Sequence, residues 1–211
     1  MTLRNKIIAA MLALTAAFGG GFATARYTAP ATINTTIAQT QVNIPAGCEN
    51  IDPQDFIETV ATPAQSGLAA YLKFLDKTQT SVYIAIYGLT ENSIGDKLIE
   101  LHQKGKTVKV LADRSQAKGR AGKALILRLR AAGIEVIIGT SPRSGIMHNK
   151  FTIIDGIWVE DGSWNYSASA DKQGNLLNFI RSKKRADFLM GVWTYLHAHM
   201  SQQNQTLEAS K

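Results

Sequence analysis

Residues 147–165, MHNKFTIIDGIWVEDGSWN, combine side-chain types that suit the chemistry of phosphate esters. Two β-rich runs flank Asp155-Gly156, a dipeptide typical of a two-residue hairpin turn, and this turn would pair Lys150 with Asp161. Because side chains alternate along a strand, one face would then hold five polar residues: His148, Lys150, Asp161, Ser163 and Asn165. The other face would hold the apolar Phe151, Ile153 and Trp158. The pattern predicts a hairpin with a site on one face and core on the other.

These polar groups could cleave a phosphodiester without a metal or any other cofactor. Neutral His148 can attack phosphorus, while Lys150 and Asn165 hold the non-bridging oxygens and stabilise the charge that grows on them. A second imidazole would protonate the leaving oxygen. The alternative interpretation is a half-exposed hairpin with ordinary polar residues on its wet face.

The spacing His148-x-Lys150-x4-Asp155, followed after six residues by Gly162-Ser163-x-Asn165, resembles the HKD signature of the phospholipase D superfamily. The GSxN form is that of its small bacterial endonuclease branch, and the likeness extends from about residue 56 to 200. The resemblance implies a phospholipase D-like α/β domain with one HKD motif in the chain. It also implies that His148 is the nucleophile or general acid, that Lys150 and Asn165 bind phosphate, that Ser163 supports the site and that Asp155 orders the hairpin. All five are expected to be catalytic residues.

One segment departs from the family pattern. Similar members usually carry a glutamate in the strand after GSxN, hydrogen-bonded to the catalytic histidine, whereas residues 173–178 read QGNLLN and contain no carboxylate. Asn175 or Asn178 could fix the imidazole tautomer, and Asp171 or Asp161 could substitute for the glutamate. An amide stabilises an imidazolium less than a carboxylate does.

A single motif implies a homodimer. The family's lipases and synthases resemble two fused copies, whereas the only other HxK here, His102-Gln103-Lys104, has Lys109 at the aspartate position. We therefore expect two chains whose His148 side chains meet at an active site on the two-fold interface.

The surrounding elements follow from hydrophobic periodicity. Helices are expected at residues 68–75, 93–104, 118–132 and 183–200, with Gly105 and Gly133 ending the second and third. Strands are expected at residues 81–87, 107–112, 135–138 and 176–181, and two more between 148 and 162. Strands that alternate with helices predict a mixed, mostly parallel central sheet flanked by helices on both faces.

The formal net charge of +7 favours a polyanionic partner, and residues 104–130 carry nine basic side chains against the single acid Asp113. We expect four substrate-binding residues after the second of the strands: Arg114, Lys118, Arg120 and Lys123. A second basic cluster spans residues 181–185. The alternative is a solvated helix face.

His197 and His199 would lie on different faces of a helix, which argues against a metal site there. Trp164, beside Asn165, is the best candidate among the aromatic residues for stacking on a base.

The chain divides into four expected segments. Residues 1–25 have the charge, apolar stretch and Ala-x-Ala ending of a signal peptide, although an uncleaved membrane anchor is the alternative. Residues 26–54 read as a linker, 55–205 as the phospholipase D-like nuclease domain and 206–211 as a tail. The protein is thus expected to be periplasmic or secreted, and to contact a membrane only if residues 1–25 are not cleaved off. The single Cys48 excludes an intramolecular disulfide and a cysteine metal cage.

The sequence as a whole predicts a metal-independent phosphodiesterase, an endonuclease that cleaves DNA, or RNA as an alternative, non-specifically through a phosphohistidine. Two alternatives remain: a phospholipase D acting on phospholipid headgroups, and a catalytically weakened nucleic-acid-binding protein that serves DNA uptake or transfer.

Overall fold

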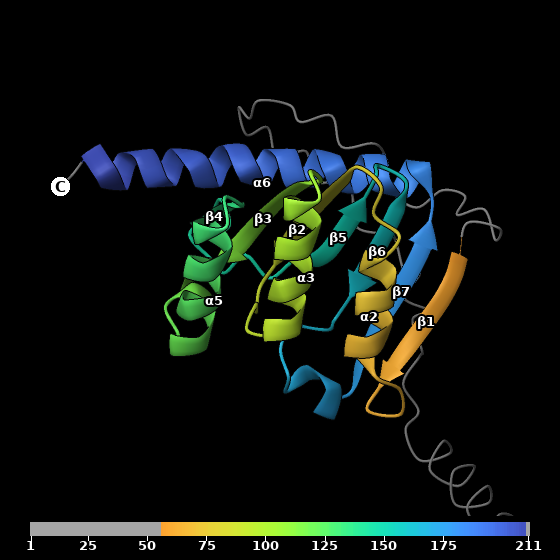
Figure 1. Cartoon of the computed structure of the whole chain (residues 1–211). Coiled ribbons are helices and arrows are strands. Elements are labelled where there is room, and N and C mark those ends of the chain that lie inside the picture. Colours follow the sequence, from red (N-terminus) through yellow and green to blue (C-terminus); the bar gives the residue numbers. More distant parts are fainter. Residues whose placement is uncertain (1–55, 210–211) are drawn as a thin grey trace, which may run out of the picture. The chain divides into compact units, whose positions relative to one another are not determined.

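The structure, a computed structural model, describes residues 56–209 (Figure 1). The expected signal peptide, the whole expected linker, Cys48 and the last two residues lie outside this range. The strands are β1 (Phe56–Thr62), β2 (Ser81–Ile86), β3 (Thr107–Asp113), β4 (Glu135–Gly139), β5 (Lys150–Ile154), β6 (Trp158–Gly162) and β7 (Asn175–Arg181). The helices are α2 (Gly67–Leu75), α3 (Asn92–Gln103), α4 (Arg114–Ala117), α5 (Arg120–Ala131), the short 3₁₀ helix η1 (Ala170–Lys172) and α6 (Lys183–Ala209).

The seven strands form one sheet in the order β1-β7-β6-β5-β2-β3-β4. Only the β2–β3 and β3–β4 pairs are parallel, and the other four pairs are antiparallel. The expected α/β class is confirmed, but the expectation of a mostly parallel sheet was wrong. The two parallel pairs have the helical crossovers that parallel pairing requires, α3 between β2 and β3 and α4 with α5 between β3 and β4, whereas α2 joins β1 to β2, which are not neighbours in the sheet. The later strands follow one another with shorter connections and pair antiparallel.

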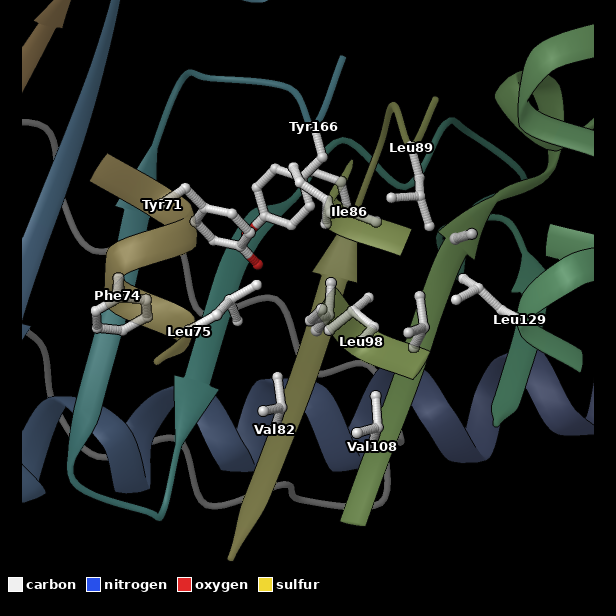
Figure 2. Packing of buried hydrophobic residues seen from close by; sticks show 14 of the residues in the cluster. Tyr71, Phe74, Leu75, Val82, Ile86, Leu89, Leu98, Val108, Leu129 and Tyr166 are labelled. Atoms are coloured by element: carbon white, nitrogen blue, oxygen red, sulfur yellow. The ribbon is translucent and has the colours of Figure 1, made fainter. Parts of the chain in front are cut away.

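Helices cover both faces of this sheet. On one face α2, α3 and α5 pack on a core cluster that contains Tyr71, Leu98 and Leu129, and Figure 2 shows this packing. On the other face α6 supplies Leu189 and Trp193 to a second cluster. The site therefore rests on a sheet that is buried from both sides.

Sequence signals at the helix ends act as expected. Gly105 and Gly133 follow α3 and α5 with φ of 79° and 90°, a region that glycine enters without strain. The basic helix expected at 118–132 is α5, which begins at Arg120 and ends at Ala131, and a separate short helix, α4, precedes it. The last helix continues to Ala209, past the expected end near residue 200 and through most of the segment expected to be a tail.

The β5–β6 hairpin has a register one residue away from the predicted one. Ile154 pairs with Trp158 and Phe151 with Asp161, so Ile157 belongs to the turn together with Asp155 and Gly156. The N–H of Ile157 donates to the carbonyl of Ile154 at 3.1 Å and its carbonyl accepts from Ser182 N at 2.9 Å, so this residue bonds to both neighbouring segments without taking a place in the β5–β6 register. A shift of one residue exchanges the faces of one strand of the pair. Asp161 therefore lies on the α6 face and Trp158 on the α2 face, opposite to the prediction.

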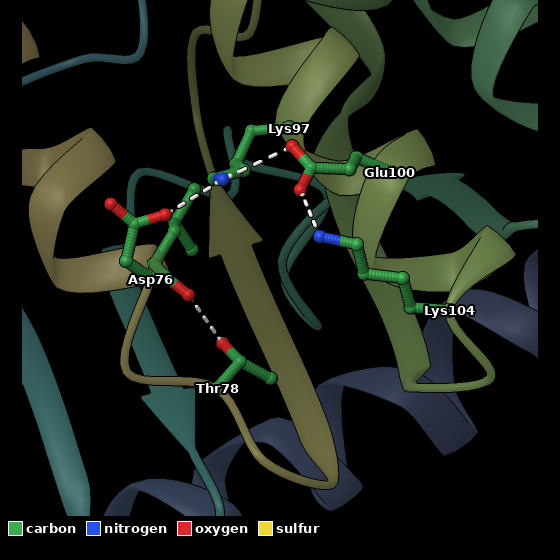
Figure 3. A network of polar contacts seen from close by, with 6 residues as sticks. Asp76, Thr78, Lys97, Glu100 and Lys104 are labelled. Carbon is green, nitrogen blue, oxygen red and sulfur yellow. Dashed lines mark hydrogen bonds and ion pairs between the residues drawn. The ribbon is translucent and has the colours of Figure 1, made fainter.

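A polar network joins α2 to α3 at the surface (Figure 3). Lys97 Nζ lies 2.7 Å from Asp76 Oδ1 and 3.0 Å from Glu100 Oε2, and Glu100 also pairs with Lys104. These exposed pairs orient the two helices and add little stability. None of the helices in residues 56–209 combines the length and apolar character that crossing a bilayer would require.

Candidate active site

The sequence-predicted residues other than Asp155 gather at one edge of the sheet. β2 and β3 end at this edge, and because β5 runs antiparallel to β2, it begins there, with Lys150 opposite Ile86. β6 ends and β7 begins at the same edge, with Gly162 opposite Leu177. The fold therefore brings the segment before β5, the segment after β6 and the start of α4 to one place.

His148 is exposed just before β5. Its ring packs edge-on against Tyr87, with centroids 4.6 Å apart and planes at 67°. Its carbonyl accepts a hydrogen bond from Lys150 Nζ at 3.1 Å. The imidazole is therefore accessible to a phosphate and tied to the lysine through the backbone.

Lys150 is only 8% exposed, and its ammonium lies 5.2 Å from the centre of the Tyr87 ring. Burial lowers the pKa of Lys150 below its ordinary value. A cation that has already lost much of its hydration interacts more strongly with an incoming anion, so Lys150 is well placed to hold a phosphate oxygen.

Asn165 and Ser163 follow β6 and are held in different ways. Asn165 Oδ1 accepts from the backbone N–H of Gly88 at 3.3 Å, which leaves the amide N–H groups available to a ligand. Ser163 Oγ donates to Asn175 Oδ1 and accepts from Leu176 N, both at 3.1 Å. Ser163 thus connects the loop after β6 to the start of β7.

Asp155 lies at the opposite edge of the sheet, in the hairpin turn. Its carboxylate accepts from the backbone N–H groups of Gln79, Thr80 and Ser81, each at 2.8 Å. Burial by itself raises the pKa of Asp155, but the hydrogen bonds from Ser81, Gln79 and Thr80 outweigh it and lower the pKa below its ordinary value. Asp155 thus ties the hairpin turn to the start of β2, at a position away from the other motif residues.

None of the side chains that could substitute for the missing glutamate contacts His148 in the described part of the chain. Asp161 binds Arg185 of α6 through Oδ2, at 2.6 and 3.0 Å, and accepts from Asn178 through Oδ1. Asp171 accepts from Trp164 Nε1 and from the first turn of α2. Asn175 is bonded to Ser163, as described above.

The basic residues expected at the substrate divide into two groups. Lys118, Arg120 and Lys123 are exposed around the start of α5, whereas Arg114 donates to Gln203 Oε1 of α6 at 3.1 Å. Several other basic residues of the two clusters are structural: Arg128, Arg130 and Arg185 bind Asp96, the carbonyl of Val136, and Asp161. Within residues 56–209, no group of three or more His, Cys, Asp or Glu side chains is arranged so that it could hold a metal ion.

The sequence did not predict three contacts near the site. Trp164, the expected base-stacking residue, is completely buried, and Tyr87 instead lies beside His148. Gln116 Nε2 donates to the Tyr87 hydroxyl at 2.9 Å. Asp113 Oδ2 accepts from Met147 N at 2.8 Å and so fixes the residue before His148. The position of Tyr87 at the end of a strand was the only signal, since these contacts join distant segments.

The comparisons with known proteins agree with this geometry. The family profile described as "Cardiolipin synthase, PLD-like domain" matches residues 71–192. A "Phospholipase D" of Rickettsia prowazekii is 34% identical over 139 residues, which are 65% of this chain and 65% of that protein. The chain thus spans just under two thirds of that relative's length. A "Mitochondrial cardiolipin hydrolase" of Chlamydomonas reinhardtii is 31% identical over 131 residues, 62% of this chain and 54% of that protein.

Two solved structures share the fold. Nuc of Salmonella typhimurium, a phospholipase D family member, superposes with a TM-score of 0.60 at 25% identity, covering 70% of this chain and 93% of Nuc. NucT of Helicobacter pylori gives a TM-score of 0.62 at 19% identity, covering 67% of this chain and 95% of NucT. With the family match over residues 71–192, the chain belongs to the phospholipase D superfamily of phosphodiesterase hydrolases.

Proposed function

We propose that the protein is a metal-independent endonuclease that cleaves DNA, with RNA as the alternative substrate, through a phosphohistidine intermediate. One observation carries the proposal. The exposed imidazole of His148 lies at the sheet edge that also presents Lys150 and Asn165, and the exposed cations around the start of α5 follow the β3 end of the same edge. A basic surface that leads into a phosphate site suits a polymer of phosphodiesters.

The proposed reaction has two displacements. A ring nitrogen of His148 forms a bond to phosphorus as the bond to the leaving oxygen breaks, and a second imidazolium gives its proton to that oxygen. Water then attacks the phosphohistidine, gives its proton to the second imidazole and releases His148. Lys150 and Asn165 stabilise the charge on the non-bridging oxygens in both steps.

The second imidazole is proposed to be His148 of another copy of the chain. The other histidines belong to helices: His102 to α3, and His197 and His199 to α6, where His197 pairs with Glu135 and His199 with Gln203. Two exposed apolar side chains close to the site in sequence, Ile146 (51% exposed) and Leu176 (52% exposed), support an interface there. A closed two-fold dimer would bring two motifs around one phosphate.

Hydrolysis of phospholipid headgroups is the second candidate, because two curated relatives carry the names phospholipase D and cardiolipin hydrolase. Binding of nucleic acid with little turnover is the third, since His148 has no carboxylate partner among the described residues. The chemistry of the first two is shared, and the substrate separates them.

The decisive experiment incubates the full chain with supercoiled plasmid, with and without EDTA, and in parallel with vesicles of phosphatidylcholine and cardiolipin. Plasmid cleavage that EDTA leaves unchanged supports the endonuclease. Release of headgroup or phosphatidic acid without plasmid cleavage supports the lipase, and retardation of the plasmid without cleavage supports the binding protein. His148→Ala should remove cleavage, whereas the matched control His199→Gln on α6 should retain it.

A mixed dimer tests the shared site. Wild-type chains and His148→Ala chains carrying different affinity tags are co-expressed, and the mixed species is purified through both tags. We expect almost no activity although one motif is intact. Half the wild-type rate, or an active monomer in sedimentation, would contradict the dimeric site.

We also propose export from the cytoplasm, on the basis of the charge, the apolar stretch and the Ala-x-Ala ending of residues 1–25. Fractionation of the native host with an antibody to the domain tests it, and a wholly cytoplasmic signal would contradict it.

A further inference from the structure

Tyr87 lies directly after β2 and contacts both His148 and Lys150. Its ring centre is 4.6 Å from that of His148 and 5.2 Å from Lys150 Nζ. The edge-on arrangement with the imidazole and the cation beside the ring are both favourable geometries for an aromatic side chain. The Tyr87 ring therefore contacts both His148 and Lys150, two of the groups that the proposed reaction needs.

The His148 imidazole has no hydrogen-bond partner among the described residues. A nucleophile must present its lone pair in a defined direction, and misplacement by about 1 Å can cost roughly 100-fold in rate. The carboxylates of Asp161 and Asp171 are engaged elsewhere, with Arg185 and Trp164. Packing against Tyr87 is therefore the contact that limits rotation of the imidazole.

Tyr87 is itself held from two sides. Its backbone N–H donates to the carbonyl of Asn149 at 2.9 Å, and its hydroxyl accepts from Gln116 Nε2 at 2.9 Å. Gln116 N in turn donates to Asp113 Oδ1 at 3.3 Å, and Asp113 Oδ2 accepts from Met147 N at 2.8 Å. The contacts close a circuit through β2, α4, the end of β3 and the segment that carries His148, so the ring has a defined place.

We propose that Tyr87 is the positioning residue for His148 and Lys150, and that Gln116 holds its ring in place. This inference rests on the proposed phosphodiesterase reaction for its kinetic consequence. The contact between the rings, in contrast, can be tested whether or not the protein cleaves any substrate.

The kinetic test uses Tyr87→Leu, which removes the ring, and Tyr87→Phe, which removes only the hydroxyl. Tyr87→Leu should lower kcat about 10- to 100-fold and leave KM within about threefold, because the lost contact orients the reacting group. Tyr87→Phe should stay within about fivefold of wild type. An unchanged kcat in folded Tyr87→Leu, or an equal loss in Tyr87→Phe, would overturn the proposal.

An NMR experiment tests the contact independently of activity. In protein with ¹³C-labelled histidine, the ring signals of His148 are assigned by their loss in His148→Ala. Tyr87→Leu should shift these signals, because the ring current of Tyr87 is gone, and should leave those of His102 and His199 in place. His148 signals that stay unmoved in a folded variant would refute the contact. If the wild-type protein cleaves no substrate but Tyr87→Leu gives the expected shifts, the proposed function is refuted and the contact between the rings is confirmed.

Gln116→Leu provides a second line if Tyr87→Leu fails to fold. Loss of this tether should lower kcat about threefold, and combining it with Tyr87→Phe should give no further loss, because both changes remove the same hydrogen bond. Additive losses would overturn the role of Gln116. Gln103→Leu, at an exposed position of α3, is the matched control and should behave as wild type.

Discussion

A buried carboxylate behind the site makes the stability of this protein depend on pH in an unusual direction. Glu160 is completely buried between the sheet and α2 and accepts from the Tyr166 hydroxyl at 2.7 Å. Thr152 Oγ1 lies 2.6 Å from the hydroxyls of both Tyr166 and Tyr71, so the hydroxyls form a chain that ends at the carboxylate. The other carboxylate oxygen of Glu160, Oε1, has no hydrogen-bond partner among the described atoms.

Burial raises the pKa of Glu160 from 4.5 to about 8, with a smaller contribution from the charge of Asp161. Between these values the folded protein binds one more proton than the unfolded chain, so the stability must fall as the pH rises. Each pH unit inside the window costs about 1.4 kcal/mol. From pH 5 to pH 8 the ionisation of Glu160 should therefore remove roughly 3–4 kcal/mol of stability.

Glu160→Gln isolates this effect, because the amide keeps the shape of the side chain and does not titrate. Urea unfolding at pH 5, 6, 7 and 8 gives the free energy of unfolding for wild type and variant. The variant should gain on wild type at each step, by roughly 3–4 kcal/mol over the series. Glu58→Gln, at an exposed position of β1, is the control and should follow wild type. Parallel curves for Glu160→Gln and wild type would refute the reasoning.

Three further changes have defined outcomes. Asp155→Asn should lower the free energy of unfolding by about 2 kcal/mol at pH 7. This deficit should shrink as the pH falls below 3.8, because the pKa of Asp155 is lowered in the folded protein and its stabilisation is lost when the carboxylate is protonated. A deficit that persists in acid would contradict this. Gly162→Ala should cost about 3 kcal/mol in urea unfolding, because the backbone φ is 154° and a Cβ would lie 2.1 Å from the carbonyl oxygen of Leu176; wild-type stability would disprove that clash. Replacing Arg120 and Lys123 by alanine should lower the slope of log K against log salt for DNA binding by about two; an unchanged slope would mean that these cations only solubilise the surface.

The features of this protein that depend on local chemistry could be predicted from the order of its residues. The spacing of His148, Lys150, Ser163 and Asn165 identified the motif, and hydrophobic periodicity located most of the strands and helices within a few residues. Gly105 and Gly133 ended the helices as expected, because only the residue type decides which backbone conformations are free of strain. Local signals failed for β1, which is an edge strand and gains its structure from pairing with β7.

Features that depend on contacts between distant segments could not be predicted and became visible only in the folded protein. Ile157 is an extra residue in the turn of the hairpin, which moves the register by one residue and places Asp161 against Arg185 instead of beside Lys150. A polar residue in a strand can face either side at equal local cost, so only the partner on α6 settled its direction. The same reason applies to Tyr87 and Trp164: both are aromatic and close to the motif, and only the packing of β2 and α2 puts one beside His148 and the other in the core.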